Sequence, residues 1–296
     1  MKKRPGAKIG ATALTVLTVA CLIVSSVAVG AQFHSRWDED ADRTWVGESY
    51  WAGRLQDWRV HDGRLECIHA GNDRNVDLLN YQLAPQSSLE MSVKISRPAT
   101  SFRGWVGFQV AAHGKQMDEY RHNVVYGDGI QAGLTHNGKL VLGRQRTEAG
   151  WRDEVRLQVE VEPRGEDSRL TLSAFAPEGQ RIARLRSVVE SDRMHGNLVL
   201  VCHANGGPPH GRALVAFSDW TLEGDNLRGG PEQEWGPILW TQYTLSRGTV
   251  KLSAQFPPLG EDDSRTALLQ LKRDGEWKEA DTARIDDMAR LALFRL

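Results

Sequence analysis

From about residue 32 onward, the sequence lacks any long run with helical periodicity. It has instead a succession of short apolar runs separated by turn residues. It also lacks an excess of basic side chains beyond its N-terminus. Residues 1–31 hold four basic and no acidic residues, which leaves 33 basic and 38 acidic side chains in the rest, a net charge of −5. A chain of that sign has no electrostatic footprint for nucleic acid, so we expect no nucleic-acid partner.

The single long hydrophobic run lies at the N-terminus. Four basic residues at positions 2–8 precede an apolar stretch over residues 9–31, a pattern that predicts an export signal peptide cleaved after Ala31. The stretch is also close to the ~20 residues that span a bilayer, so the alternative is an uncleaved membrane-anchoring helix. Either way we expect an exported protein, periplasmic, extracellular or at the cell surface, with membrane contact only through residues 9–31 if they are retained.

The sequence after the N-terminal hydrophobic run predicts an all-β protein. The stretch DWRVHDGRLEC (57–67) places Asp-Gly between two short strand-like runs, the signal for a β-hairpin with which the folded part is expected to open. The stretch VRLQVEV (155–161) alternates strictly, as a half-buried strand does, whereas LVLVC (198–202) is apolar on both faces, as a central strand of a sandwich is. Many short strands at this spacing favour a β-sandwich or barrel.

Composition divides the chain. Residues 33–226 match a large jelly-roll sandwich, and the polar, Gly-rich residues 227–236 are interpreted as a linker. Residues 237–296 form a small second β unit with five expected strands, of which the last is apolar on both faces. A finished small sandwich has about seven strands, so we expect this unit to be incomplete.

Two cysteines follow the export segment, Cys67 and Cys202, and both lie in strand-like runs. Export permits them to form a disulfide. The alternative is two buried free thiols, because cysteine is among the most buried residue types.

The first region resembles the concanavalin-like or laminin-G-like jelly-roll family, which includes modules found beside or within secreted sugar hydrolases. The resemblance is carried by WRVHDGRL (58–65), GWVGFQV (104–110), DGIQAGL (128–134) and FSDW (217–220). It implies the fold and leaves the ligand open.

The second region, beginning GPILWTQYTLSRG (236–248), resembles the small fibronectin-like or immunoglobulin-like domain that precedes the catalytic domain in the alkaline phosphatase D family of metallophosphoesterases. The order of export signal, jelly roll and small sandwich is similar to longer members of that family. The resemblance implies a catalytic domain outside this chain, and divalent metals are expected only there, with no cofactor in this chain.

Patterns for catalysis are weak. Metallophosphoesterases bind two metals through Asp-x-His, Gly-Asp-x-x-Asp/Asn and Gly-Asn-His patterns, and none of the three is complete here. Glu160 and Glu162 share a strand face, as the carboxylate pair of a jelly-roll glycosidase does, but they alternate with valines, which favours a solvated face opposite the core. We assign no catalytic residue and no metal ligand, and leave enzymatic activity of this chain open.

Two polar loops rich in aromatic and planar side chains are the best candidates for ligand binding, because such side chains stack on sugar rings and hydrogen-bond their hydroxyls. The candidate residues are Tyr120, Arg121, His122, Asn123, Asp128, His203, Asn205 and His210. Trp45, Trp51 and Trp151 are further candidates for exposed aromatic surfaces.

The leading hypothesis is an exported accessory region, for binding or scaffolding, of an alkaline phosphatase D-like metallophosphoesterase. Its expected partners are a polysaccharide or cell-surface glycan and its own catalytic domain. The alternatives are a secreted jelly-roll glycoside hydrolase or carbohydrate-binding protein, and a structural spacer at the cell surface.

Overall fold

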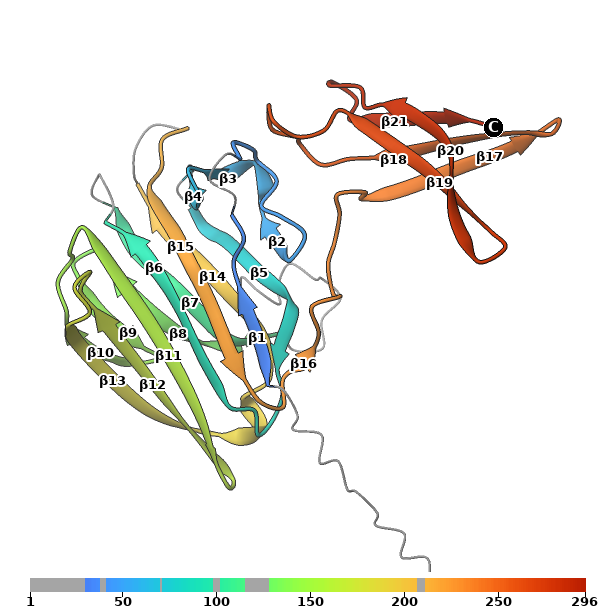
Figure 1. Ribbon diagram of the computed structural model, residues 1–296. Coiled ribbons are helices and arrows are strands. Elements are labelled where there is room, and N and C mark those ends of the chain that lie inside the picture. Colours follow the sequence, from blue (N-terminus) through green and yellow to red (C-terminus); the bar gives the residue numbers. More distant parts are fainter. Residues whose placement is uncertain (1–29, 38–40, 70, 98–101, 115–127, 207–210) are drawn as a thin grey trace, which may run out of the picture.

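The computed structural model describes residues 30–37, 41–69, 71–97, 102–114, 128–206 and 211–296. Within these ranges the first unit consists of two antiparallel sheets of eight strands each, packed face to face (Figure 1). The expectation of an all-β sandwich of the concanavalin-like jelly-roll type is confirmed by this architecture. No helix in the described ranges is long and apolar enough to cross a membrane. The predicted export segment falls almost wholly outside them.

Each sheet combines runs of consecutive strands with pairings between distant parts of the chain. Sheet A contains, in spatial order, β13 (Arg181–Glu190), β12 (Asp167–Phe175), β11 (Glu154–Arg164), β6 (Leu89–Ser96), β15 (Val215–Gly224), β4 (Arg64–Cys67) and β3 (Trp58–His61), and β1 (Ala31–His34) pairs with β15. Sheet B contains β10 (Gln145–Glu148), β9 (Lys139–Leu142), β8 (Asp128–Thr135), β7 (Arg103–His113), β14 (Gly196–Asn205), β5 (Gly71–Leu83) and β16 (Arg228–Gly229), and β2 (Tyr50–Gly53) pairs with β5. Two short 3-10 helices, η1 (Leu55–Asp57) and η2 (Ser191–Arg193), complete the sandwich.

The predicted hairpin is β3–β4. His61 pairs with Arg64, and both turn residues have positive φ, 47° at Asp62 and 66° at Gly63. A two-residue turn of this kind matches the twist of the flanking strands, which is why Asp-Gly favours it. The interpretation that the folded part opens with this hairpin is wrong, because β1 and β2 precede it. Each of those is only four residues long and gains its pairing from β15 or β5, far along the chain.

The core lies between the two sheets. In β11 every second residue from Val155 to Val161 is buried, as the alternation predicted, and in β14 all five residues of 198–202 are buried. The largest completely buried side chains include Trp58, Trp220 and Phe108. At ~1.5–3 kcal/mol for each large apolar side chain removed from water, this layer is the main source of the stability of the sandwich.

The second unit has five strands in two small sheets. They are β17 (Trp240–Ser246), β18 (Thr249–Gln255) and β21 (Leu291–Arg295) in one sheet, and β19 (Thr266–Arg273) and β20 (Glu276–Arg284) in the other. Its core is small, and several large apolar side chains stay exposed. Tyr243 lies on the same sheet face as the buried Phe294, because both are in register with Leu252, yet Tyr243 is 72% exposed. The core-facing side of this sheet is therefore only partly covered.

The predicted linker, 227–236, is attached to the sandwich. Arg228 and Gly229 pair with β5 as β16, and the backbone N–H of Trp235 donates to the carbonyl of Glu48 at 2.8 Å. Asn80 of β5 donates to the carbonyls of Pro231 and Gln233, at 3.1 and 3.2 Å. These bonds hold the segment between the two units against the edge of sheet B.

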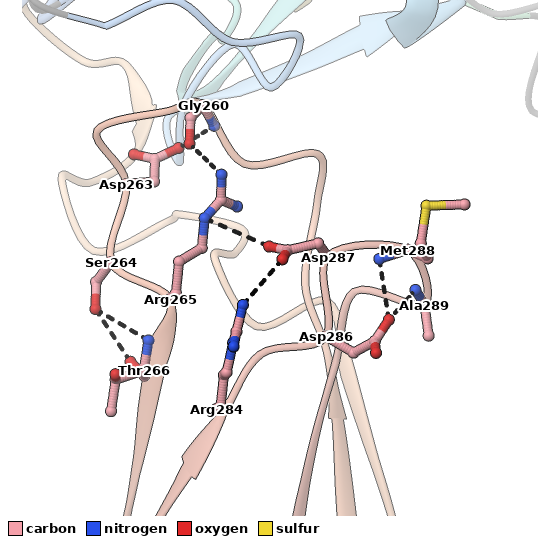
Figure 2. Close-up of polar contacts among 10 residues, drawn as sticks. All are labelled: Gly260, Asp263, Ser264, Arg265, Thr266, Arg284, Asp286, Asp287, Met288 and Ala289. Atoms are coloured by element: carbon pink, nitrogen blue, oxygen red, sulfur yellow. Dashed lines mark hydrogen bonds and ion pairs between the residues drawn. The ribbon is translucent and has the colours of Figure 1, made fainter.

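The two units meet through an ion pair. Arg43 lies 2.7 Å from Asp263, whose other carboxylate oxygen accepts from the backbone N–H of Gly260 at 2.7 Å. Figure 2 shows this loop and the neighbouring carboxylates, each of which has a protein partner. Asp287 pairs with Arg265 and Arg284, and Asp286 accepts from two backbone N–H groups, which lower its pKa. These acidic groups therefore brace the loops of the second unit.

Candidate functional site

The structure describes only part of the predicted ligand-binding set. Tyr120, Arg121, His122, Asn123 and His210 lie outside the described residues. Asp128 is the first residue of β8. His203 and Asn205 lie at the end of β14, on the face of sheet B that points away from the core, because their neighbours Cys202 and Ala204 point into it.

His203 is part of an aromatic platform, by which we mean the paired side chains of Trp105 and His203. The two residues are opposite each other on β7 and β14, and their rings stack with centroids 6.3 Å apart and planes 21° from parallel. Both side chains are half-buried. The rings therefore support each other and keep one side accessible to solvent.

A glycine on the next strand makes room for the indole. Gly133 on β8 lies opposite Gly107 on β7, and a Cβ added to Gly133 would be 2.9 Å from Cε3 of Trp105. The indole therefore lies across the backbone of β8 instead of standing away from the sheet. The same Cβ would lie even closer to the backbone oxygen of Val106, so a larger residue at position 133 would meet both the backbone of β7 and the indole. These two close approaches are the local reason for the glycine in the stretch DGIQAGL.

The surroundings of the platform are mixed in polarity. Asn205 and Arg103 are opposite each other at the end of the sheet, and both are exposed. On the other side, a small buried cluster formed by Ala112, Val199 and Val201 packs against Trp105. The platform is thus an aromatic surface bordered by planar polar groups, an arrangement suited to a ligand with both apolar and hydroxylated faces.

A buried carboxyl lies on the same outer face. Asp77 of β5 is 4% exposed, and it is opposite Val199 of β14 and Trp51 of β2. Its Oδ1 accepts from Asn197 at 2.9 Å, while Oδ2 has no hydrogen-bond partner. Burial raises the pKa of Asp77 to about 7, and the bond from Asn197 only partly offsets this. The side chain is therefore poised between its neutral and ionised forms near neutral pH.

Among the three tryptophans named from the sequence, only Trp51 is markedly exposed. It is 43% exposed and its ring lies 4.7 Å from that of Trp235. Trp45 is buried, and Trp151 is half-buried with its Nε1 donating to the carbonyl of Thr135 at 3.1 Å. Trp105 was not singled out from the sequence. The sequence could have indicated Trp105 through the glycines of the two strands around it, because glycine in a strand often marks a backbone over which a large side chain lies.

The carboxylate pair considered for glycosidase chemistry is engaged by other side chains. Glu160 and Glu162 lie on the outer face of sheet A, as their alternation with buried valines predicted. Glu162 binds Arg169 and Arg164, and these partners lower its pKa. Glu160 accepts from Gln158 at 3.2 Å. In the described ranges, no three His, Cys, Asp or Glu side chains are grouped so that they could hold a metal ion.

The two cysteines face each other across the core. Cys67 is on β4 of sheet A and Cys202 is on β14 of sheet B, and both are buried free thiols. A hydrogen bond between them and burial together raise the pKa of Cys202. The thiols are therefore in contact, and the predicted disulfide stays a prediction.

No protein-family profile and no curated protein matches the chain. Solved structures similar to it include lectin I from Ulex europaeus in complex with the methyl glycoside of alpha-L-fucose, at 9% identity and a TM-score of 0.44, covering 66% of this chain and 98% of that one. Arcelin-5, a lectin-like defense protein from Phaseolus vulgaris, is similar at 9% identity and a TM-score of 0.41, over 67% and 99% of the two chains. The carbohydrate recognition domain of Emp47p is similar at 13% identity and a TM-score of 0.39, over 62% and 90%.

Proposed function

We propose that the sandwich is an exported, non-catalytic module that binds glycan on the outer face of sheet B. The observation that carries this proposal is the aromatic platform. A flat, half-exposed pair of rings packs against the C–H face of a sugar, and the exposed Asn205 beside it offers hydrogen bonds to hydroxyl groups. His203 and Asn205 are residues that the sequence had already indicated for this role.

The test is retention of the whole exported chain, residues 32–296, on immobilised polysaccharides and on a glycan array. Trp105→Ala and His203→Ala should each weaken binding about tenfold or more, equivalent to ~1.4 kcal/mol. Trp277→Ala is the matched control, because Trp277 is 64% exposed on β20 of the second unit and should leave retention unchanged.

Because Trp105 is half-buried, thermal unfolding of each variant must accompany the binding measurement. Equal loss of binding in the Trp277 variant would contradict the platform. So would full retention by both platform variants when their unfolding midpoints match that of the unaltered chain.

We further propose that this chain is the accessory region of an alkaline phosphatase D-like metallophosphoesterase. The incompletely covered face of the second unit supports it, since exposed residues such as Tyr243 and Leu245 require a further packing partner. Sequencing the gene past the codon for Leu296 is the test. A continuing reading frame that carries metal-binding Asp, His and Asn motifs is expected, and a stop codon directly after Leu296 would overturn this assignment.

A further inference from the structure

A cavity of about 550 Å³ opens beside the sandwich, well separated in the fold from the aromatic platform. We call it the flank cavity. It lies where β1 of sheet A and β2 of sheet B approach each other, and the segment after β16 borders it. Its lining includes Phe33, Trp45, Glu48, Tyr50, Asn80 and Glu234. The volume is within the ~300–1,000 Å³ usual for small-molecule sites.

Aromatic rings fix one side of the flank cavity. Phe33 and Tyr50 meet edge to face with centroids 6.0 Å apart, and Tyr50 also stacks on the completely buried Trp220 at 5.9 Å. These rings are anchored in the core of the sandwich. The wall they form is therefore rigid, and it presents apolar carbon surface to a ligand.

Three buried polar atoms in the lining, Oδ1 of Asn80, Nε1 of Trp45 and Oη of Tyr50, have no hydrogen-bond partner among the described residues. Asn80 is 2% exposed and uses both hydrogens of its amide on the carbonyls of Pro231 and Gln233, while its Oδ1 accepts nothing. Trp45 is 6% exposed and its Nε1 donates to nothing. A buried polar group without a hydrogen-bond partner destabilises the folded chain. A ligand that supplied hydrogen-bond donors and acceptors to these atoms would remove that cost.

Two carboxyl groups meet at the cavity from different segments. Glu48 and Glu234 both line the cavity, and the backbone N–H of Trp235 donates to the carbonyl of Glu48 at 2.8 Å, which holds the two glutamate-bearing segments next to each other. Burial and the neighbouring Glu234 raise the pKa of Glu48, and Arg43 opposes this. A cation bound beside the two carboxyl groups would favour the ionised form of Glu48 and be attracted by it.

The basic side chains of the lining are either paired with an acidic group or exposed to water, so they repel a bound cation only weakly. Arg43 is engaged by Asp263 at 2.7 Å and by the carbonyl of Trp45 at 3.3 Å. His34 lies 3.8 Å from Asp219, and both His34 and Arg36 are exposed on β1 and just after it, where water screens them. The half-buried charged groups of the lining are Glu48 and Arg43, and Arg43 is already paired with Asp263, so Glu48 is the main determinant of charge preference inside the cavity.

We propose that the flank cavity binds a hydroxylated primary amine of the amino-sugar class. The ammonium group lies at the Glu48–Glu234 pair, and the hydroxyl groups pair with Oδ1 of Asn80 and Nε1 of Trp45. The apolar face of the ligand packs on the aromatic wall. A simple alkyl diamine satisfies the carboxyl groups but leaves Trp45 without an acceptor, and an N-acetylated sugar offers hydroxyls without the charge.

The test is isothermal titration of the exported chain with three probes at a pH where the amines are protonated. Glucosamine is expected to bind, and N-acetylglucosamine and putrescine are each expected to bind at least tenfold more weakly. Glu234→Gln and Glu48→Gln should each weaken glucosamine binding tenfold or more. Glu232→Gln is the matched control, since Glu232 is exposed in the same segment but does not line the cavity.

Several results would overturn the proposal. N-acetylglucosamine binding as tightly as glucosamine would remove the role of charge, and putrescine binding as tightly would remove the role of the hydroxyls. Absence of binding by all three probes, or an undiminished affinity in both glutamate variants, would remove the site itself. Trp277→Ala, in the second unit, should leave glucosamine affinity unchanged. Because the platform is tested by polysaccharide retention of its own variants and the cavity by glucosamine affinity of the glutamate variants, failures of the two proposals are distinguishable.

Discussion

Asp77 makes the stability of the sandwich depend on pH in a direction opposite to that of most carboxylates. Burial raises its pKa to about 7 in the folded chain, against ~3.9 for an unperturbed aspartate. Between these two values the folded chain binds a proton that the unfolded chain does not. The contribution of Asp77 to the free energy of unfolding is therefore highest at pH 4 or below and falls as the pH rises toward 7, above which it stays constant.

The size of the effect follows from the shift. About three pKa units at ~1.36 kcal/mol each give a loss of ~4 kcal/mol between pH 4 and pH 8. Asp77→Asn removes the titration and keeps an acceptor for the bond from Asn197, which is 2.9 Å in length. We expect the variant to match the unaltered chain within ~1 kcal/mol near pH 4 and to be ~3–4 kcal/mol more stable at pH 8.

The assay is urea unfolding under reducing conditions at unit steps from pH 4 to pH 8, followed by tryptophan fluorescence. Trp58 and Trp220 are completely buried, so the signal reports the sandwich, whereas Trp240 and Trp277 of the second unit are already exposed.

Asp219→Asn is a control of opposite sign, because the ion pair with Lys94 at 2.8 Å lowers the pKa of Asp219. Its contribution is present above the unfolded pKa and lost as the pH falls toward the folded one, so this variant should be less stable than the unaltered chain near neutral pH, and the difference should shrink as the pH falls through the acidic range. Identical pH trends from 4 to 8 in the Asp77→Asn variant and the unaltered chain would refute the assignment to Asp77.

Two further predictions concern the cysteines and the second unit. Exposure to oxidised glutathione should join Cys67 and Cys202, with two electrons and two protons passing to the oxidant. Closing a loop of about 135 residues should stabilise the chain by up to ~5 kcal/mol. Intact mass would detect the disulfide, and an unfolding midpoint that falls when reductant is added would show its effect on stability. Two thiols that can still be alkylated after oxidation would contradict the prediction. Residues 237–296 expressed alone should aggregate, because Tyr243 and Leu245 are 72% and 68% exposed. Tyr243→Thr with Leu245→Lys should reduce aggregation in size-exclusion chromatography, and a monomeric, cooperatively unfolding unaltered fragment would show that the unit is complete.

Local patterns in the sequence correctly predicted the elements whose cause is local. The Asp62-Gly63 hairpin has two turn residues with positive φ, as their residue types favour. The alternation of 155–161 predicted which side chains of β11 are buried. β5 shows the limit of this reasoning, because this thirteen-residue strand, Gly71–Leu83, has no simple alternation of polar and apolar residues. Its polar Asn75, Asp77 and Asn80 lie on a face that only other segments bury.

The candidate sites were predicted less well, and the reason is again physical. The sequence could place His203 on a strand, but the stacking partner Trp105 comes from a strand about a hundred residues earlier, and their contact depends on the register of β7 with β14. The flank cavity was not predicted, because Phe33, Tyr50 and Glu234 belong to three segments that meet only when the sandwich closes.

The sequence by itself determined the all-β class, the turns and the alternation of buried and exposed positions, because these depend on backbone preferences and on side chains two to four residues apart. The tertiary structure alone decided which strands are neighbours, why Asp77 is buried and which polar atoms remain unpaired. Those properties depend on contacts between residues tens to hundreds of positions apart, such as the meeting of Glu48 with Glu234 or of Cys67 with Cys202. Pairing of this kind is set by the closing of the whole sandwich, since only then do both sheets exclude water from the surfaces between them.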